Sequence, residues 1–220
     1  MSQTKRTPRT ARKYHHGDLR NSLIQAARAL LTETDNPDFS LREVAARAGV
    51  SHNAPYNHFA DKNELLAAVA AAGFDELGES MQKAIKGIAD PTAALIKTGG
   101  IYATFGIKNP ALFRLMWGNE VTAMRRSDPE CAVQKSAIAA RNVAVDVIRR
   151  GAAAGVFTVS PDSEKEIALA SLTIWSTIHG LTTLTLGGTY AVWRETDAKV
   201  AEKVATMCCY GLLRREPSAS

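Results

Sequence analysis

Apolar residues recur at helical spacing along almost the whole chain. The first run occupies the i, i+4, i+7, i+8 and i+11 positions of one helical face: Leu19, Leu23, Ala26, Ala27 and Leu30. Prolines at positions 37, 91, 110, 129 and 161 separate one apolar run from the next. Only the residues around Thr158 and Val159 read as extended, and that stretch is too short for a sheet. The pattern predicts an all-α protein.

Two of the predicted helices carry strong start signals. Ser40 and Glu43 have the spacing of a capping box, in which each side chain satisfies a backbone N–H beside the other. Asp61 precedes another apolar run, with Glu64 three residues later. We therefore expect helices to begin directly after Ser40 and Asp61.

Other boundaries are indicated by single residues. Asp18 is a candidate N-cap of the first helix, and Asp128 with Pro129 predicts another start. Pro161 and Asp162 are expected to open a long apolar helix that runs to about Leu186 before two glycines. A last helix is expected over about 197–213.

Residues 40–59 have the pattern of a helix-turn-helix. Gly49 supplies the backbone freedom for a tight turn, and Ser51 is the expected N-cap of a second, short helix. A generic helical hairpin is the alternative, but it would accept almost any polar residue after Ser51. This helix instead presents only hydrogen-bonding, non-acidic polar side chains: His52, Asn53, Tyr56, Asn57 and His58. The segment therefore predicts an element that enters the major groove of DNA.

The net charge supports an anionic partner at this end of the chain. The chain has 27 basic and 22 acidic residues, a formal charge of +5. The first 20 residues account for the whole excess of positive charge. They contain one acidic residue, Asp18, and six basic residues: Lys5, Arg6, Arg9, Arg12, Lys13 and Arg20. We interpret residues 1–13 as a basic flexible arm that lies along phosphate or in the minor groove. A solubilising tail is the alternative.

Residues 15–70 resemble the DNA-binding domain of the TetR family of transcriptional regulators. The resemblance rests on the segments HHGDLRNSLIQAARALL, LREVAARAGVS and YNHFADKNELL. It implies phosphate contacts for Tyr56, His58 and Lys62. More loosely, residues 175–180 and 109–116 resemble the C-terminal ligand-binding class of that family with a Trp-His-Gly signature.

The expected DNA contacts differ in kind. An asparagine can bond bidentately to adenine, so Asn53 or Asn57 could read a base, although each suits a phosphate or a water equally well. Arg42 could reach phosphate or a base edge, or stay solvated. The predicted DNA-binding residues are Lys5, Arg6, Arg9, Arg12, Lys13, Arg42, Ser51, His52, Asn53, Tyr56, Asn57, His58 and Lys62.

Pro55 departs from the family pattern, which usually has an aliphatic residue before the tyrosine. If Ser51 is the N-cap, proline at this position removes a bond to the Ser51 carbonyl and crowds it. We therefore predict a distorted or 3₁₀-like first turn, which shifts His52 and Asn53 relative to the family norm.

The chain divides into the arm (1–13), a three-helix DNA-binding domain (14–60), and a larger helical effector-binding and dimerisation domain (61–215). In the family the last two long helices form a two-fold interface, which implies a homodimer on palindromic DNA. His179 with Gly180 is interpreted as a close helix crossing rather than a catalytic site. The predicted ligand-binding residues, each of which could instead simply fill the core, are Ile101, Phe105, Phe113, Met116, Trp117, Trp175 and His179.

Other protein classes lack support in the sequence. It contains no nucleophile elbow, phosphate-binding loop, zinc-protease, C-x-x-C or dinucleotide-binding motif, so we expect neither an enzyme nor a cofactor. His15 and His16 lack further ligands at metal-binding spacing. Cys131, Cys208 and Cys209 form no disulfide framework, which favours a reducing compartment.

The expected location is the cytoplasm. The longest uninterrupted apolar run, Leu65 to Ala72, is far shorter than the ~20 residues of a membrane helix, and the basic N-terminus lacks the apolar segment of a secretory signal.

The sequence thus predicts a ligand-responsive transcriptional regulator that binds double-stranded DNA. The resemblance implies a repressor that a small molecule releases from a palindromic operator. The helix that starts at Asp61 belongs to both halves of the chain, so a ligand in the body could tilt it. Activation and a ligand-free, constitutive DNA-binding protein are the alternatives, and effector-dependent release in a mobility-shift assay would exclude the ligand-free one.

Overall fold

The computed structural model describes residues 16–189 and 197–212. Over these ranges the regular structure is helical and contains no β-strand, which confirms the all-α prediction. Five predicted DNA-binding residues, Lys5, Arg6, Arg9, Arg12 and Lys13, lie outside the described residues.

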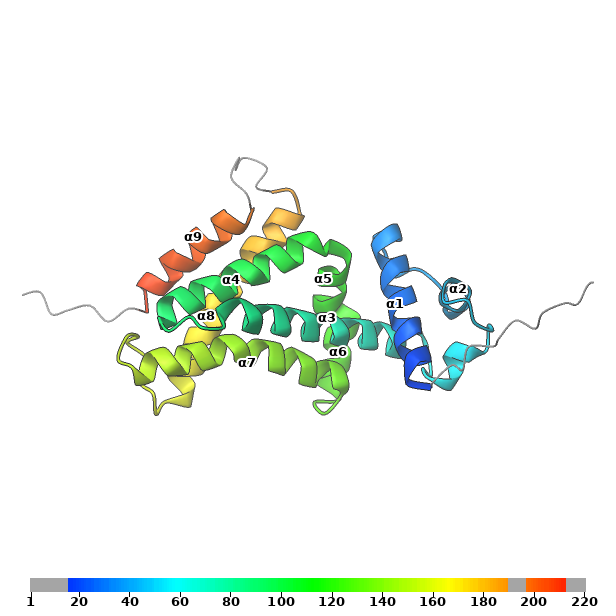
Figure 1. Cartoon of the computed structure of the whole chain (residues 1–220), viewed down its shortest axis with the longest axis horizontal. Coiled ribbons are helices and arrows are strands. Elements are labelled where there is room, and N and C mark those ends of the chain that lie inside the picture. The colour runs from blue at the N-terminus through cyan, green and yellow to red at the C-terminus, as the bar shows by residue number, and fades with distance from the viewer. Residues whose placement is uncertain (1–15, 190–196, 213–220) are drawn as a thin grey trace, which may run out of the picture.

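The N-terminal helices form a small unit at one tip of an elongated molecule (Figure 1). It consists of α1 (His16–Thr34), α2 (Leu41–Arg47) and a 3₁₀ helix, η1 (Ala54–Asn57). Leu23, Val44 and Phe59 are almost fully buried between them. The apolar face predicted from residue 19 therefore packs inward, and its buried side chains hold α2 and η1 against α1.

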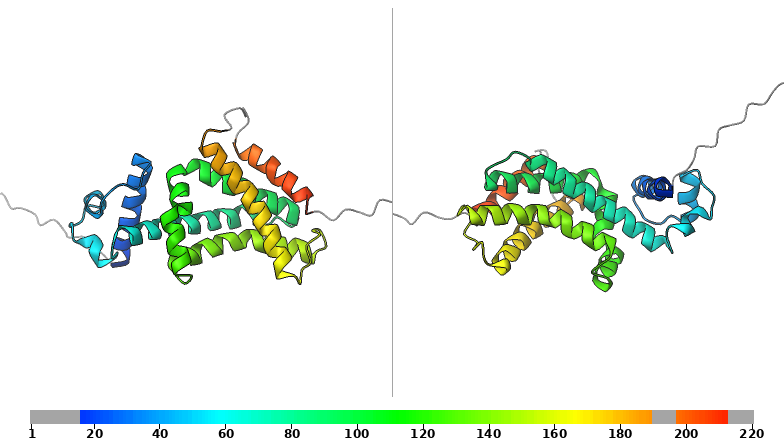
Figure 2. Two further views of the ribbon diagram at one scale, coloured as in Figure 1. Left: turned by 180° about the vertical axis from the view of Figure 1, so that it is seen from behind. Right: turned by 60° about the horizontal axis from the view of Figure 1, so that its bottom comes forward.

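Helix α3 (Lys62–Ile85) connects this unit to the rest of the molecule. Its first turns contact α1, and farther along it packs on α4, α5, α6 and α7 (Figures 1 and 2). One continuous apolar core extends from Leu23 of α1 through Phe74 of α3 to Ala205 of α9. Helix α3 therefore contributes to the packing at both ends of the molecule.

The body surrounds the distal part of α3 with six helical elements. They are α4 (Pro91–Lys108), α5 (Pro110–Trp117), α6 (Asn119–Ser127), α7 (Ala132–Ala153), α8 (Glu164–Leu186) and α9 (Asp197–Tyr210). Helix α7 runs beside α3, while α8 and α9 pack on each other and on α4 (Figure 2). Short connections between α4, α5 and α6 turn the chain sharply across the end of the body that faces α1.

Several helix starts follow the sequence prediction. The Ser40–Glu43 capping box is formed, with the Glu43 N–H 3.2 Å from the Ser40 hydroxyl and the Ser40 N–H 2.7 Å from the Glu43 carboxylate. The Asp61 carboxylate accepts the Glu64 N–H at 2.8 Å and caps α3. Helix α9 begins at the predicted Asp197.

Three predicted starts are wrong. Helix α1 begins at His16, so Asp18 lies inside it. Asp128 ends α6 and its carboxylate accepts the Glu130 N–H in the following turn, so α7 begins only at Ala132. Helix α8 begins at Glu164, because Ser163 rather than Asp162 caps it.

The close helix crossing expected at Gly180 lies elsewhere. A Cβ placed on Gly180 would meet no atom within 4 Å. A Cβ on Gly106 of α4 would instead lie 2.6 Å from the Thr182 methyl carbon and 2.9 Å from the Phe113 ring. The small residue that lets α4 and α8 approach is therefore Gly106, not Gly180.

Helix α8 is unusually apolar on its outer side. By length and composition it is the one helix in the described ranges that could cross a membrane, although 33% of its most apolar window is buried in the body. The large apolar side chains exposed on α8 and α9 are Leu169, Leu172, Leu184, Met207 and Tyr210. They form a surface that no described part of the chain covers.

Candidate DNA-binding surface and ligand cavity

The turn after α2 is closed by backbone hydrogen bonds. Gly49 has a φ of 70°, a conformation that favours glycine. Its N–H bonds the Ala46 carbonyl at 3.1 Å, and the Val50 N–H bonds the Ala45 carbonyl at 3.0 Å. This paired arrangement ends the helix in a fixed direction and so orients the segment that follows.

That segment is a 3₁₀ helix, as predicted from Pro55. The Ala54 N–H bonds the Ser51 carbonyl at 3.0 Å, and the His58 N–H bonds the Pro55 carbonyl at 2.9 Å, both with three-residue spacing. The capping role predicted for Ser51 is wrong, because the N-cap is Asn53 and no side chain caps the helix. Proline has no N–H to continue an α-helical ladder from Ser51, which explains the tighter winding.

Most of the predicted DNA-contacting side chains within the described residues are exposed. Ala54, Pro55 and Phe59 are buried and anchor the segment, whereas Tyr56 is 55% exposed. Lys62 is half-buried, with its ammonium 5.6 Å from the centre of the Phe39 ring. Of the others, His58 is half-buried and the rest are exposed: Arg42, Ser51, His52, Asn53 and Asn57. None of these side chains makes a hydrogen bond or an ion pair with another described residue.

The acids beside this surface are engaged within the domain. Glu43 accepts from the Ser40 backbone and hydroxyl, and these bonds lower the pKa of its carboxyl. Glu64 accepts the Ala60 N–H at 2.6 Å. Glu33 is paired with Arg47, which lowers the pKa of the glutamate. The surface thus presents unpaired donors while its carboxylates are held in caps and a salt bridge.

The body contains a cavity of about 380 Å³ between α3, α4, α7 and α8. Its lining is mostly apolar, and its volume is in the range of small-molecule sites. Of the seven predicted ligand-binding residues, Trp117 and Trp175 line it. The other five lie outside the lining, in the aromatic cluster beside it or in the core: Ile101, Phe105, Phe113, Met116 and His179.

An aromatic cluster forms one wall of the cavity. The Trp117 ring lies 5.1 Å from Phe74 and 5.3 Å from Trp175, centre to centre. His179 stacks between Trp175, at 5.2 Å, and Phe113, at 5.4 Å. Rings from α3, α5 and α8 therefore meet here, so a ligand against this wall contacts three helices at once.

A hydrogen-bonded chain fixes the polar atoms of the cluster. The Trp175 indole N–H donates to the Tyr102 hydroxyl at 3.3 Å, and that oxygen lies 2.8 Å from His179 Nδ1. Burial lowers the pKa of His179 and raises the pKa of Tyr102, so both are neutral near pH 7. Tyr102 therefore donates to an unprotonated Nδ1. The Trp117 indole N–H is buried and has no hydrogen-bond partner among the described residues.

Sequence reasoning missed the polar lining. Tyr102, which lines the cavity, is adjacent in sequence to the predicted Ile101, which does not. Neighbouring helix positions differ by about 100° in direction, so the two residues lie on different sides of α4. Arg125, Gln134 and Arg141 belong to no motif. One signal was available for Arg141, because no acid stands three or four residues from it on either side of its helix.

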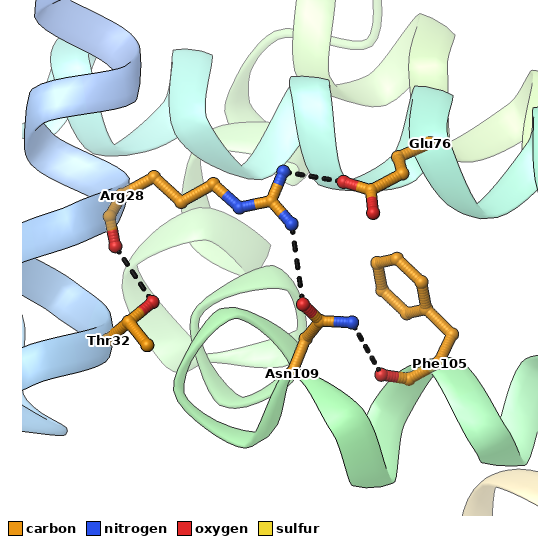
Figure 3. Close-up of polar contacts among 5 residues, drawn as sticks. All are labelled: Arg28, Thr32, Glu76, Phe105 and Asn109. Atoms are coloured by element: carbon orange, nitrogen blue, oxygen red, sulfur yellow. Dashed lines mark hydrogen bonds and ion pairs between the residues drawn. The ribbon is translucent and has the colours of Figure 1, made fainter.

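Polar contacts tie α1 to the body (Figure 3). The Arg28 guanidinium pairs with Glu76 of α3 and also donates to the Asn109 side-chain oxygen at 3.3 Å, and Asn109 donates to the Phe105 carbonyl at 3.0 Å. A second ion pair joins Asp35, which follows α1, to Arg114 of α5. Helix α5 thus carries Trp117 on the cavity side and contacts α1 on the other.

The chain matches two family models. Residues 23–69 match the bacterial regulatory proteins of the tetR family, and residues 95–207, just over half of the chain, match the tetracyclin repressor-like C-terminal domain. The HTH-type transcriptional regulator BetI of Serratia proteamaculans (strain 568) is 33% identical over 75 residues, which span 34% of this chain and only 38% of that protein.

Solved structures share the fold over nearly the whole length. A protein of unknown function from Rhodococcus sp. RHA1 is 28% identical, covers 93% of this chain and 100% of its own, and has a TM-score of 0.76. A TetR family transcription regulator from Marinobacter aquaeolei VT8, 18% identical, covers 90% and 96% with a TM-score of 0.64. The chain belongs to the TetR family of transcriptional regulators, which bind DNA and dimerise, and it joins a helix-turn-helix domain to a ligand-binding helical domain.

Proposed function

We propose that this chain is a dimeric repressor that leaves a palindromic operator when a small molecule enters the cavity between α3, α4, α7 and α8. Chromosomal DNA places this activity in the cytoplasm, and we assign the chain no catalytic step. The observation that carries the proposal is the position of α3, which lines the cavity with Phe74 and presents Lys62 beside the DNA-binding surface.

DNA binding is assigned to the exposed side chains of the helix-turn-helix. Tyr56, His58 and Lys62 hold phosphate, while Asn53 and Asn57 face the base edges. Arg42 at the start of α2 and the basic residues of the 1–13 arm add further phosphate contacts. The absence of competing partners among the described residues supports these roles, because no internal bond must be broken to meet DNA.

Dimerisation is assigned to the exposed apolar surface of α8 and α9. Leu169 is 61% exposed and Met207 is 73% exposed, and covering one such side chain contributes about 1.5–3 kcal/mol. A two-fold interface buries the same surface on both copies. It also accounts for the apolar composition of α8 without a membrane.

The oligomeric state tests this assignment. Leu169→Glu and Met207→Glu together are expected to yield a monomer in light scattering, since four charges would face each other across the interface. Ala139→Glu is the matched control, because Ala139 is an exposed residue on α7 that belongs neither to this surface nor to the cavity lining. A double variant that remains dimeric would contradict the assignment.

Release is assigned to a shift of α3 and α5. A ligand against Trp117 and Phe74 presses on both helices, and the Arg28 contacts pass the displacement to α1. The separation of the two DNA-binding surfaces then no longer matches the spacing of the half-sites. A coupling of ~1–3 kcal/mol weakens operator binding about 5- to 150-fold.

In vitro selection of DNA bound by the full-length chain tests the function directly. We expect a palindrome whose half-sites are about one helical turn or more apart. A reporter with that operator is expected to be repressed. Selected DNA without two-fold symmetry, or a reporter that the protein activates, would contradict the proposal. Binding that no added small molecule ever weakens would favour a constitutive DNA-binding protein.

A further inference from the structure

We infer that the effector of this cavity is a small amphipathic acid, with a carboxylate held by Arg125 and Arg141 and an apolar body laid along α7 and α8. The inference rests on the proposed ligand-responsive function and names the chemical class of its ligand.

Arg125 is half-buried, and no carboxylate of the described residues pairs with its guanidinium. Its guanidinium carbon lies 5.3 Å from the centre of the Phe74 ring and 5.4 Å from that of Trp117, and its Nε donates to the Gln134 side-chain oxygen at 2.7 Å. Its two terminal nitrogens make no hydrogen bond or ion pair with described residues. The stacking and the Gln134 bond therefore fix the group and leave its paired donors free for an anion.

Arg141 adds a second cation at the same end of the cavity. It lines the space with Arg125 and Gln134, two helical turns along α7 from Gln134, and forms no ion pair within the described ranges. Burial is the main cause that lowers the pKa of Arg125. Cys131 opposes this effect, and the nearby Arg141 charge adds to it. The two positive charges repel each other, and no acid of the described residues lies between them. An anion bound between the two arginines would relieve this repulsion.

The opposite end of the cavity is already neutralised. Arg149 also lines it, but this guanidinium is 2.7 Å from the Glu164 carboxylate and 3.6 Å from that of Asp146. The contrast on one helix shows where the free charge lies. An acidic group of a ligand would therefore meet an unpaired positive charge at the Arg125 end of the cavity. A second acidic group at the Arg149 end would not.

Between the two ends the lining is apolar. On α7 it extends from Gln134 to Arg149, about 22 Å at 1.5 Å per residue. Leu77, Ile148, Ile167 and Ile174 face this stretch and contribute no polar atom from their side chains. The buried Trp117 N–H, which lies beside the Tyr102 hydroxyl and makes no hydrogen bond with the described residues, offers one more donor to a ligand oxygen. An apolar body with one acid at its end satisfies all of these features.

Matched probes separate charge from shape. We would titrate the full-length protein with octanoate, decanoate and 4-phenylbutyrate, and with the primary amide and primary amine of each. Calorimetry and the fluorescence of Trp117 and Trp175 report binding. We expect each acid to bind about tenfold or more tightly than its amide, because a charge-assisted pair replaces a neutral hydrogen bond.

Two variants test which residues cause the preference for acids. Arg125→Met keeps the apolar stem over Phe74 and Trp117 but removes the charge, and Arg141→Gln removes the second charge. Both are expected to abolish most of the acid preference while amide binding stays within about threefold. Arg150→Gln is the matched control on α7, because Arg150 is exposed and does not line the cavity, and it is expected to keep the preference.

Three results would overturn the inference: amides or amines that bind as tightly as the acids, an Arg150→Gln variant that loses the preference equally, or no binding by any of the nine probes. Operator release measured in parallel distinguishes the two proposals. An amide or amine that binds and releases DNA overturns the ligand class alone. Acids that bind the cavity and leave operator binding unchanged support the ligand class and contradict the repressor mechanism.

Discussion

At the level of single residues, Gly151 leaves the least room for a side chain of all the described glycines. A Cβ at this position would lie 2.2 Å from the Phe157 ring, which is almost fully buried. Gly151→Ala is therefore expected to lower the free energy of unfolding by about 1–3 kcal/mol, since an overfilled core must shift. Urea unfolding of Gly151→Ala, Phe157→Leu and the double variant forms a cycle. The cost of the alanine should shrink when the ring is absent, and an equal cost in both backgrounds would refute the clash.

His179 predicts how stability depends on pH. Burial lowers the pKa of its imidazole in the folded protein below the ordinary 6.5. As the pH falls through 6.5, His179 becomes protonated in the unfolded chain but stays neutral in the folded chain. The free energy of unfolding therefore decreases. Below the folded pKa both states are protonated at this site and the decrease stops.

His179→Asn isolates this contribution, because the asparagine oxygen can accept from Tyr102 in place of Nδ1. We expect the unfolding free energy to decrease less between pH 7.5 and 5 in the variant than in the parent, measured by urea unfolding at each pH. The same pH profile in both proteins would show that His179 titrates normally.

At the level of elements, local chemistry decided what could be predicted. The Ser40–Glu43 box and the Asp61 cap require only residues three apart, and both are formed. Asp128 followed by Pro129 satisfied another local rule, that of an N-cap before a proline, yet its carboxylate accepts the Glu130 N–H instead. The cavity lining could not be predicted, because Arg125 and Arg141 meet only through the packing of α6 and α7. Patterns local in sequence were thus readable, and contacts between helices were not.

Pro55 determines the form of the DNA-reading element. Pro55→Leu restores an N–H near the Ser51 carbonyl and keeps an apolar side chain in a buried position. We expect η1 to rewind toward an α-helix, with a gain below the ~3 kcal/mol that proline costs inside a helix. Hydrogen exchange should show a protected amide at residue 55. The DNA sequence chosen by in vitro selection should change as well, since His52 and Asn53 move with the first turn. An unprotected amide together with an unchanged selected site would contradict this account.

At the level of the whole molecule, the N-terminal arm is expected to add affinity without adding sequence preference. Its five basic residues lie outside the described part of the chain, so their role remains a prediction. Removal of residues 1–13 should flatten the plot of log affinity against log salt by ~0.9 for each phosphate that the arm neutralises. The selected operator should stay the same. An unchanged slope would assign the arm to solubility alone.

Coupling between the two domains is expected to depend on the contacts of Arg28. Arg28→Met removes the bonds to Glu76 and Asn109 and keeps an apolar stem at the half-buried position. Operator affinity without ligand should change by less than about threefold, because no DNA-facing side chain is altered. Ligand-induced release should weaken by about fivefold or more, the lower range of an allosteric coupling.

Arg47→Met is the matched control for this experiment. It removes one charge and one ion pair in the same domain, but its partner Glu33 lies on α1, so every bond between α1 and the body stays in place. Release should stay at the parent level in this variant and fall further when Arg114→Met is added to Arg28→Met, since Asp35 then has no partner on α5. If the double variant still releases DNA as the parent does, the signal travels through α3 alone, and the polar contacts of α1 serve only to dock the DNA-binding domain on the body.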